Sequence, residues 1–213
     1  MTEQLFLESI KAKGGLLHNL DLHQERVDRV FNHFFGQKAG FNLASLLPKP
    51  PDLNLYKVRL VYGLKPVDIQ IIPYEIPKID RVFLVKADEI NYDFKFLDRQ
   101  PINNLKKLAQ ANEANKDNKP IEVIIIRNGL LTDSSIANLV LENQSGLFTP
   151  QTPLLAGVKR EYLLRKKIIV PAKISVGDIM LFGKIRFINA MIDLTDDVFI
   201  KTKDLDFGAF GHS

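Results

Sequence analysis

The run Ile121–Ile126 is the segment that most constrains the fold of this chain. All but one of its residues are apolar, a length and composition typical of a strand buried within a sheet. Arg127-Asn128-Gly129 follows at once. Asn and Gly tolerate the positive φ angles of tight turns, so this tripeptide predicts that the chain reverses there.

The first third of the chain predicts a small α+β lobe. Asp21 is placed to cap a helix that runs to about Phe35, whose apolar residues recur at three- and four-residue spacing. A second, short helix is predicted at Phe41–Leu47. Strands are predicted at Leu5–Lys13, Leu16–Leu17, Leu55–Tyr62 and Val67–Pro73, with a turn at Gly14-Gly15.

Pro73 and Pro77 predict a lobe boundary, because two nearby prolines restrict the backbone. We therefore expect a lobe over residues 1–77 and a larger one over 78–213. In the larger lobe we predict helices at Ile102–Asn115, after Gly157 and around Val176–Phe182, a polar loop at Asn115–Lys119, and a partly disordered tail from Asp204. The strands expected there, besides the central run, are Val82–Lys86, Ala137–Leu141, Gly146–Thr149 and Ile185–Leu194.

Composition excludes several classes of function. The chain has 213 residues, 46% of them hydrophobic, which is enough for a substantial core, and no cysteine, which excludes disulfides and thiol chemistry. The net charge of +4 is weak and spread, so we expect no nucleic-acid partner. No apolar stretch is long enough for a membrane span, and we expect a cytoplasmic protein. The four histidines lack metal-ligand spacing, so no metal is expected.

Three features could carry chemistry. Lys95 lies between Phe94 and Phe96, where apolar neighbours can desolvate an amine and make it a nucleophile, although an exposed strand lysine is the ordinary alternative. Asp133 follows two leucines and a turn, and could be a catalytic acid or a simple turn residue. Gly157 leads into a basic helix, whose first N–H groups can bind a phosphate. An amine, an acid and an anion site are together what pyridoxal 5'-phosphate (PLP) requires.

These motifs resemble, in order and approximate spacing, those of the class IV aminotransferase family, the fold-type IV PLP enzymes. The K-x-L-D-R segment at Lys95 is similar to the K-x-L-N-R of the aminodeoxychorismate lyase branch. Residues 157–160 (G-V-K-R) match the family's G-I-T-R, and residues 23–26 match its H-x-x-R. Asp133 stands where the family usually has Glu. The segment "FINAMIDL" contains Asn189-Ala190, similar to the N-A-L of the lyase branch.

The resemblance implies a role for each matching residue. Lys95 would form the Schiff base with PLP and move the substrate proton, and Asp133 would keep the pyridine nitrogen protonated. Arg26 and the backbone N–H groups of Val158 and Lys159 would hold the phosphate. The remaining implied contacts are Ser134, Ser135 and Asn138 with the cofactor, and Glu8, Arg59 and Arg99 with the substrate.

The implied fold is α+β and fold-type IV, with a small N-terminal lobe and a larger lobe containing a barrel-like sheet. It is N-terminally shortened, since the chain begins almost directly at the Leu5 strand, where family members usually carry additional strands. The family is typically homodimeric. The implied function is an aminodeoxychorismate lyase, forming 4-aminobenzoate and pyruvate for folate synthesis. The alternatives are a D-amino-acid or branched-chain aminotransferase acting on a small amino substrate, and a non-catalytic PLP-binding paralogue.

Overall fold

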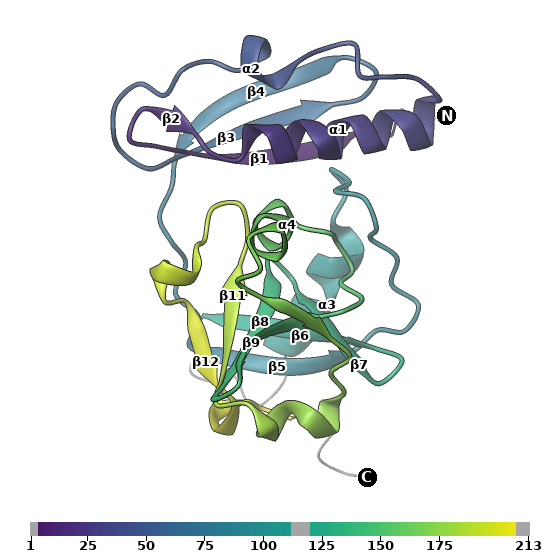
Figure 1. The fold of residues 1–213 in the computed structure, drawn as a ribbon. Coiled ribbons are helices and arrows are strands. Elements are labelled where there is room, and N and C mark those ends of the chain that lie inside the picture. Colours follow the sequence, from purple (N-terminus) through teal and green to yellow (C-terminus); the bar gives the residue numbers. More distant parts are fainter. Residues whose placement is uncertain (1–3, 112–119, 208–213) are drawn as a thin grey trace. The chain divides into compact units, whose positions relative to one another are not determined.

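The computed structural model describes residues 4–111 and 120–207 (Figure 1). The predicted loop at Asn115–Lys119, the last four residues of the predicted helix before it, and the tail from residue 208 lie outside the described residues. By internal contacts the chain forms two compact units. Unit 1 comprises Met1–Ile76 and Phe94–Asp98, and unit 2 comprises Pro77–Asp93 and Arg99–Ser213. Within the described residues, no helix has the length and apolar character needed to cross a membrane.

Unit 1 is an antiparallel sheet covered on one face by a long helix, α1 (Leu20–Phe35) (Figure 1). Alternate residues of the first strand, from Phe6 to Ile10, point to the buried face, where they join Val27 and Phe31 of α1. Glu8 lies on that same face. The strand order is β2-β1-β3-β4, and the elements are β1 (Phe6–Lys13), β2 (Leu16–Leu17), α2 (Leu43–Leu46), β3 (Tyr56–Tyr62) and β4 (Pro66–Pro73).

The start of α1 differs from the prediction. Its N-cap is Asn19, in the left-handed region with φ 52°, and Asp21 falls in the first turn. Asn is one of the few residues that adopt this conformation readily, and an acid in the first turn suits the helix dipole. The helix ends at Phe35, as the sequence predicts, and its C-cap is Gly36 with φ 63°.

The segment Phe94–Asp98 belongs to unit 1 because it pairs with the edge of β1. The Leu7 N–H donates to the Lys95 carbonyl, and the Leu97 N–H donates to the Leu5 carbonyl, both at 2.9 Å. Phe96 pairs with Phe6, and the rings of Phe94 and Phe96 join the aromatic core of the unit. Lys95 is therefore carried on an irregular edge segment of the small unit.

Unit 2 is a curved mixed sheet of eight strands around its own core (Figure 1). Every residue of Ile121–Ile126 is buried, in agreement with the sequence, and this strand runs parallel to β5. The strand order is β10-β9-β8-β7-β6-β5, with β11 also on β8 and β12 on β11. The strands are β5 (Arg81–Lys86), β6 (Ile121–Arg127), β7 (Leu130–Ser134), β8 (Asn138–Asn143), β9 (Gly146–Pro150), β10 (Val170–Ala172), β11 (Lys184–Ile188) and β12 (Phe199–Lys201).

Three predictions for unit 2 need correction. Asp133 lies in strand β7, which the sequence analysis missed, and not in a turn. The helix predicted at Val176–Phe182 is 3-10 (η2, Val176–Leu181). The strand predicted to Leu194 ends at Ile188, because the Asn189 side chain accepts the N–H groups of residues 191 and 192 and turns the chain. The first helix of unit 2 is α3 (Gln100–Gln110), and α4 (Val158–Arg165) follows Gly157 as predicted. Two short 3-10 turns, η3 (Leu194–Asp196) and η4 (Thr202–Asp204), lie near the end of the described residues.

Candidate active site

Asp133 is a buried acid whose two oxygens are both engaged within unit 2. Oδ1 accepts a hydrogen bond from Asn138 Nδ2 at 2.7 Å, and Oδ2 accepts one from the Leu155 N–H at 2.8 Å. Burial raises the pKa of Asp133 to about 7, against the opposing effects of these two bonds and of the Arg160 charge. The carboxyl can therefore change its protonation state near neutral pH.

Asn138 connects this acid to the start of α4. Its Nδ2 also donates to the Leu155 carbonyl at 2.8 Å, and a Cβ atom on Gly157 would overlap with its Oδ1. A glycine is thus required at position 157 for this close approach. One continuous cluster in the structure contains Asp133, Asn138 and Gly157, although these residues are separated along the chain.

The first turn of α4 is the predicted anion site. Val158, Lys159 and Arg160 are buried, and the first N–H groups of a helix have no acceptor within the helix. The Lys159 ammonium pairs with Asp193 and lies 5.2 Å from the centre of the Tyr162 ring. Its side chain is therefore already engaged, and its backbone N–H is the group that suits a phosphate.

Ser134 is the last residue of β7, and Ser135 follows it in the turn between Asp133 and Asn138. The Ser134 hydroxyl accepts the N–H groups of Ile136 and Ala137 at 3.2 and 2.9 Å. The Ser135 N–H donates to Glu122 at 3.0 Å, and its carbonyl accepts a bond from Arg99. Glu122 was missed by the sequence analysis, although it is the one charged residue inside the apolar run Ile121–Ile126, and that anomaly could have identified it.

In unit 1 the structure brings Glu8 and Arg26 together. Arg26 donates from Nε and Nη2 to the two oxygens of Glu8 at 2.8 and 2.6 Å, and His23 Nδ1 lies 2.5 Å from the second oxygen. Burial alone would raise the pKa of Glu8, but Arg26 and His23 lower it to about 2. Burial lowers the pKa of His23 despite Glu8, and its Nε2 has no hydrogen-bond partner among the described residues.

Lys95 and Arg59 also lie in unit 1. Lys95 is half-buried, and its charge contributes to the lowered pKa of His23, so the two side chains are within electrostatic range. Arg59 of β3 pairs with Asp68 of β4 at 3.0 Å. The predicted residues thus form two sets, Glu8, Arg26, Arg59 and Lys95 in unit 1, and Arg99, Asp133, Ser134, Ser135, Asn138, Val158 and Lys159 in unit 2.

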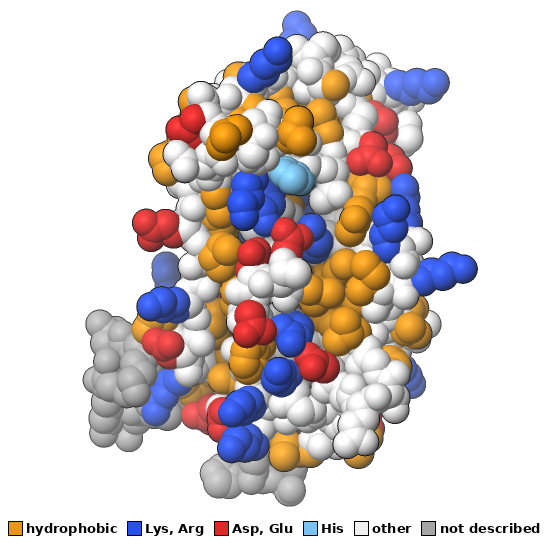
Figure 2. Space-filling model, turned by 60° about the vertical axis from the view of Figure 1, so that its left-hand side comes forward, with side chains coloured by type: hydrophobic (Ala, Val, Ile, Leu, Met, Phe, Trp, Pro, Cys, Tyr) orange, Lys and Arg blue, Asp and Glu red, His pale blue; other side chains and the backbone are white. Residues whose placement is uncertain are grey.

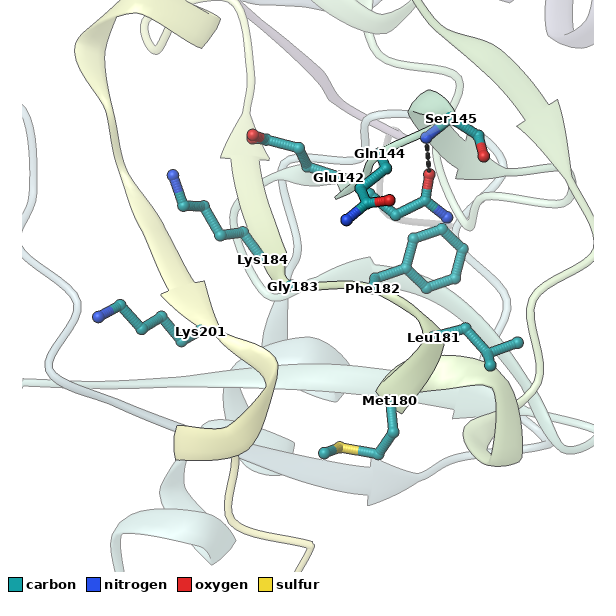
Figure 3. Close-up of a pocket in the computed structure, with 10 residues that line it drawn as sticks. Glu142, Gln144, Ser145, Met180, Leu181, Phe182, Gly183, Lys184 and Lys201 are labelled. Carbon is teal, nitrogen blue, oxygen red and sulfur yellow. Dashed lines mark hydrogen bonds between the residues drawn. The ribbon is translucent and has the colours of Figure 1, made fainter.

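The surface groove of unit 2 is a separate feature (Figure 3). It has a volume of about 760 Å³ and is lined by residues 142–145, 180–184 and 201. Glu142 and Asn143 lie at the end of β8 opposite Asn138, and no predicted site residue is among those that line it. Acidic and basic side chains are interspersed on the face drawn in Figure 2.

Comparison with known proteins identifies the family. No family model matches the sequence. An uncharacterized protein of Haemophilus influenzae is 38% identical over 189 residues, covering 86% of this chain and 96% of the relative. The crystal structure of a Haemophilus somnus protein, provisionally assigned as a 4-amino-4-deoxychorismate lyase, is 31% identical with a TM-score of 0.77, and the match covers 91% of this chain and 100% of that chain. The chain belongs to the class IV aminotransferase family, the fold-type IV PLP enzymes.

A solved structure of much lower sequence identity has a similar fold and holds ligands. A hypothetical aminotransferase of Mycobacterium tuberculosis, in a form with α-ketoglutarate and PMP bound, has a TM-score of 0.68 at 13% identity, and the match covers 99% of this chain and 88% of that one. Its PLP-bound form has a TM-score of 0.65 at 14% identity, covering 97% and 84%. PLP is therefore the cofactor that the fold family implies.

The residues present fit PLP. A class IV aminotransferase needs an acid for the ring nitrogen, donors for the phosphate and an amine for the aldehyde. Asp133 is a buried carboxyl close to the α4 N-terminus, and Gly157 keeps side-chain atoms out of the space next to Asn138. Unit 2 also has the N–H groups of Val158 and Lys159, which suit a phosphate. Unit 1 by itself carries the Lys95 amine and Arg26, whose Nε and Nη2 are bonded to Glu8.

Proposed function

We propose that this protein is an aminodeoxychorismate lyase, which releases pyruvate from aminodeoxychorismate and forms 4-aminobenzoate. The observation that carries the proposal is the buried Asp133–Asn138 pair beside the Gly157-led helix. The 31% identity to the Haemophilus somnus protein and the K-x-L-D-R segment at Lys95 support the lyase over a transaminase.

Each of the candidate site residues would have a distinct role. Bound PLP supplies an electron sink for the carbon that bears the substrate amine. Lys95 would attach the cofactor through Nζ and, once the substrate amine has displaced it, carry a proton to and from the substrate at that same atom. Asp133, oriented by Asn138 and the Leu155 N–H, would accept a hydrogen bond from the protonated ring nitrogen.

The phosphate would be held by charge and by backbone donors. The N–H groups of Val158 and Lys159 point along the α4 dipole and suit a dianion. Glu8 fixes the orientation of the Arg26 fork through two hydrogen bonds. A homodimer, a role in folate synthesis and a cytoplasmic location remain predictions.

The attachment of the cofactor is tested by borohydride reduction of the PLP-loaded protein, followed by peptide mapping. We expect the reduced label on Lys95. The matched control is Lys86→Arg, a change of an exposed lysine in the strand β5 of unit 2, which should not alter the labelling. Label on another lysine, or none in a protein that retains PLP, contradicts the assignment of Lys95.

The reaction is tested by measuring pyruvate per active site from aminodeoxychorismate without an added keto acid. A lyase gives many turnovers, because elimination returns the cofactor to its starting form. A transaminase stops after one half-reaction until an acceptor is supplied. Acceptor-dependent amino-donor activity without pyruvate would favour the aminotransferase, and PLP retention with neither activity would favour the non-catalytic paralogue.

A further inference from the structure

The backbone N–H and carbonyl of Ser135, which belong to two successive peptide groups, are each bonded to an ionisable side chain of unit 2. On one side, the Ser135 N–H donates to Glu122 Oε1 at 3.0 Å. Glu122 comes from the central strand β6 and is 1% exposed, so this acceptor is shielded from water. The same oxygen accepts the Val123 N–H at 2.8 Å, and Lys106 of α3 lies 3.4 Å from the other oxygen. The Glu122 carboxyl is thereby fixed by three groups.

On the other side, the Ser135 carbonyl accepts a hydrogen bond from Arg99 Nη2. Arg99 is the N-cap residue of α3. A cationic donor therefore meets the carbonyl of the peptide group after Ser135, and an acidic acceptor meets the N–H of the peptide group before it. Hydrogen bonds to charged groups are stronger than those between neutral groups. Together the two bonds restrain the backbone on both sides of Ser135.

Ser135 lies in the turn that joins Asp133 to its partner Asn138. Asp133 and Asn138 are cross-strand neighbours, and the Ser134 N–H donates to the Ala137 carbonyl at 2.8 Å to close the turn between them. A rotation of either peptide group that flanks Ser135 would move the start of β8, and with it the Asn138 amide that bonds to Asp133. The orientation of the acid thus depends on groups that do not touch it.

We propose that Arg99 and Glu122 are positioning residues, which act together on the two peptide groups that flank Ser135 to keep Asp133 and Asn138 in their hydrogen-bonded arrangement. Only the catalytic meaning of this arrangement rests on the proposed function. The proposal gives Glu122 a role that the sequence analysis did not find. It also gives Arg99 a role different from the substrate contact that the family resemblance implied.

The test is the titration of the Asp133 carboxyl, followed by carbon-13 NMR in cofactor-free protein. Glu122→Leu removes the acceptor and Arg99→Met removes the donor. Each should raise the pKa of Asp133 by about 0.5 to 1 pH unit, because a weakened Asn138 bond no longer favours the ionised form. The milder Glu122→Gln and Arg99→Lys retain an acceptor oxygen and a cationic donor, and should remain closer to the parent protein.

Arg186 and Glu142 provide the matched control. They form an Arg–Glu pair at 2.7 Å in the same unit, away from the turn, and Arg186→Met should leave the Asp133 titration unchanged. If Arg99→Met leaves the titration unchanged and only raises KM for the amino substrate, the proposal is overturned and Arg99 is a substrate residue. If Glu122→Leu does not fold, the two Arg99 variants and Glu122→Gln still decide, and an unchanged titration in Arg99→Met again overturns the proposal. The titration of Asp133 uses cofactor-free protein. Its result therefore does not depend on the outcome of the lyase assay.

Discussion

The contact between Gly157 and Asn138 sets the strictest limit on substitution at the candidate site. We predict that Gly157→Ala displaces Asn138, because the added Cβ would overlap with its Oδ1. Such overpacking costs about 1–3 kcal/mol, and the change should also weaken PLP retention through loss of the Asn138–Asp133 bond. Urea unfolding and dialysis against cofactor-free buffer measure the two effects.

Gly177→Ala is the control for this change. A Cβ at Gly177 would meet only Ser175 Oγ at 3.7 Å, an ordinary van der Waals distance, so stability and retention should be near those of the parent. Equal behaviour of the two variants would mean that the chain around Gly157 adjusts without cost, and would remove Gly157 from the site.

Single residues differ in how far the sequence could predict them. Gly157, Asp133 and Asn138 were identified through family motifs of fixed spacing, and the structure joins them. The Glu122–Ser135 and Arg99–Ser135 bonds join residues 13 and 36 positions apart, so they depend on strand pairing that no local pattern encodes. The pairing of Arg26 with Glu8 was missed for the same reason, since β1 and α1 meet only after the lobe has folded.

At the scale of elements, the ion pair between β1 and α1 makes Arg26 a structural residue as well as a candidate phosphate ligand. We predict that Arg26→Ala destabilises the cofactor-free protein by about 3–5 kcal/mol, because Glu8 is fully buried and would lose its cation. Arg29→Ala, one turn further along the same helix at an exposed position, should change stability by less than ~0.5 kcal/mol.

A double variant separates the two roles of Arg26. Glu8→Gln with Arg26→Met removes the pair without leaving a buried charge, and should recover most of the stability lost in Arg26→Ala. If this stable double variant still loses PLP on dialysis while Arg29→Ala retains it, Arg26 contributes to the phosphate site. Retention equal to that of Arg29→Ala would argue against that role.

Most elements could be predicted because their patterns are local. The three- and four-residue spacing of α1 and the apolar run of β6 are each sufficient to define an element. β7 was missed because Thr132, Asp133 and Ser134 are polar residues that favour turns in isolation. In the structure this segment is a strand because it pairs with β6 and β8, and its polar side chains are bonded internally, as in the bond from Thr132 Oγ1 to the Ile125 carbonyl.

At the scale of the whole molecule, two buried acids should give stability an optimum in mildly acidic solution. The pKa of Glu8 in unit 1 is lowered to about 2, so its stabilising effect is present above its unfolded value of 4.5 and is lost as the pH falls towards 2. The pKa of Asp133 in unit 2 is raised to about 7 from 3.8. The stability that this raised pKa contributes is fully present below pH 3.8, where Asp133 is neutral in both states. It is lost as the pH rises to 7.

We therefore predict that urea unfolding of the cofactor-free protein gives a maximum free energy near pH 4 to 5, with losses on the order of 3 kcal/mol on each side. Asp133→Asn should flatten the decline between pH 4 and 7 and leave the acid side unchanged. Glu8→Gln should do the reverse, flattening the acid side alone. The slopes are compared rather than the absolute stabilities, because the amide introduced by Asp133→Asn would place a donor near either Asn138 Nδ2 or the Leu155 N–H. An Asp133→Asn protein with the parent's slope between pH 4 and 7 would show that Asp133 does not titrate near neutrality.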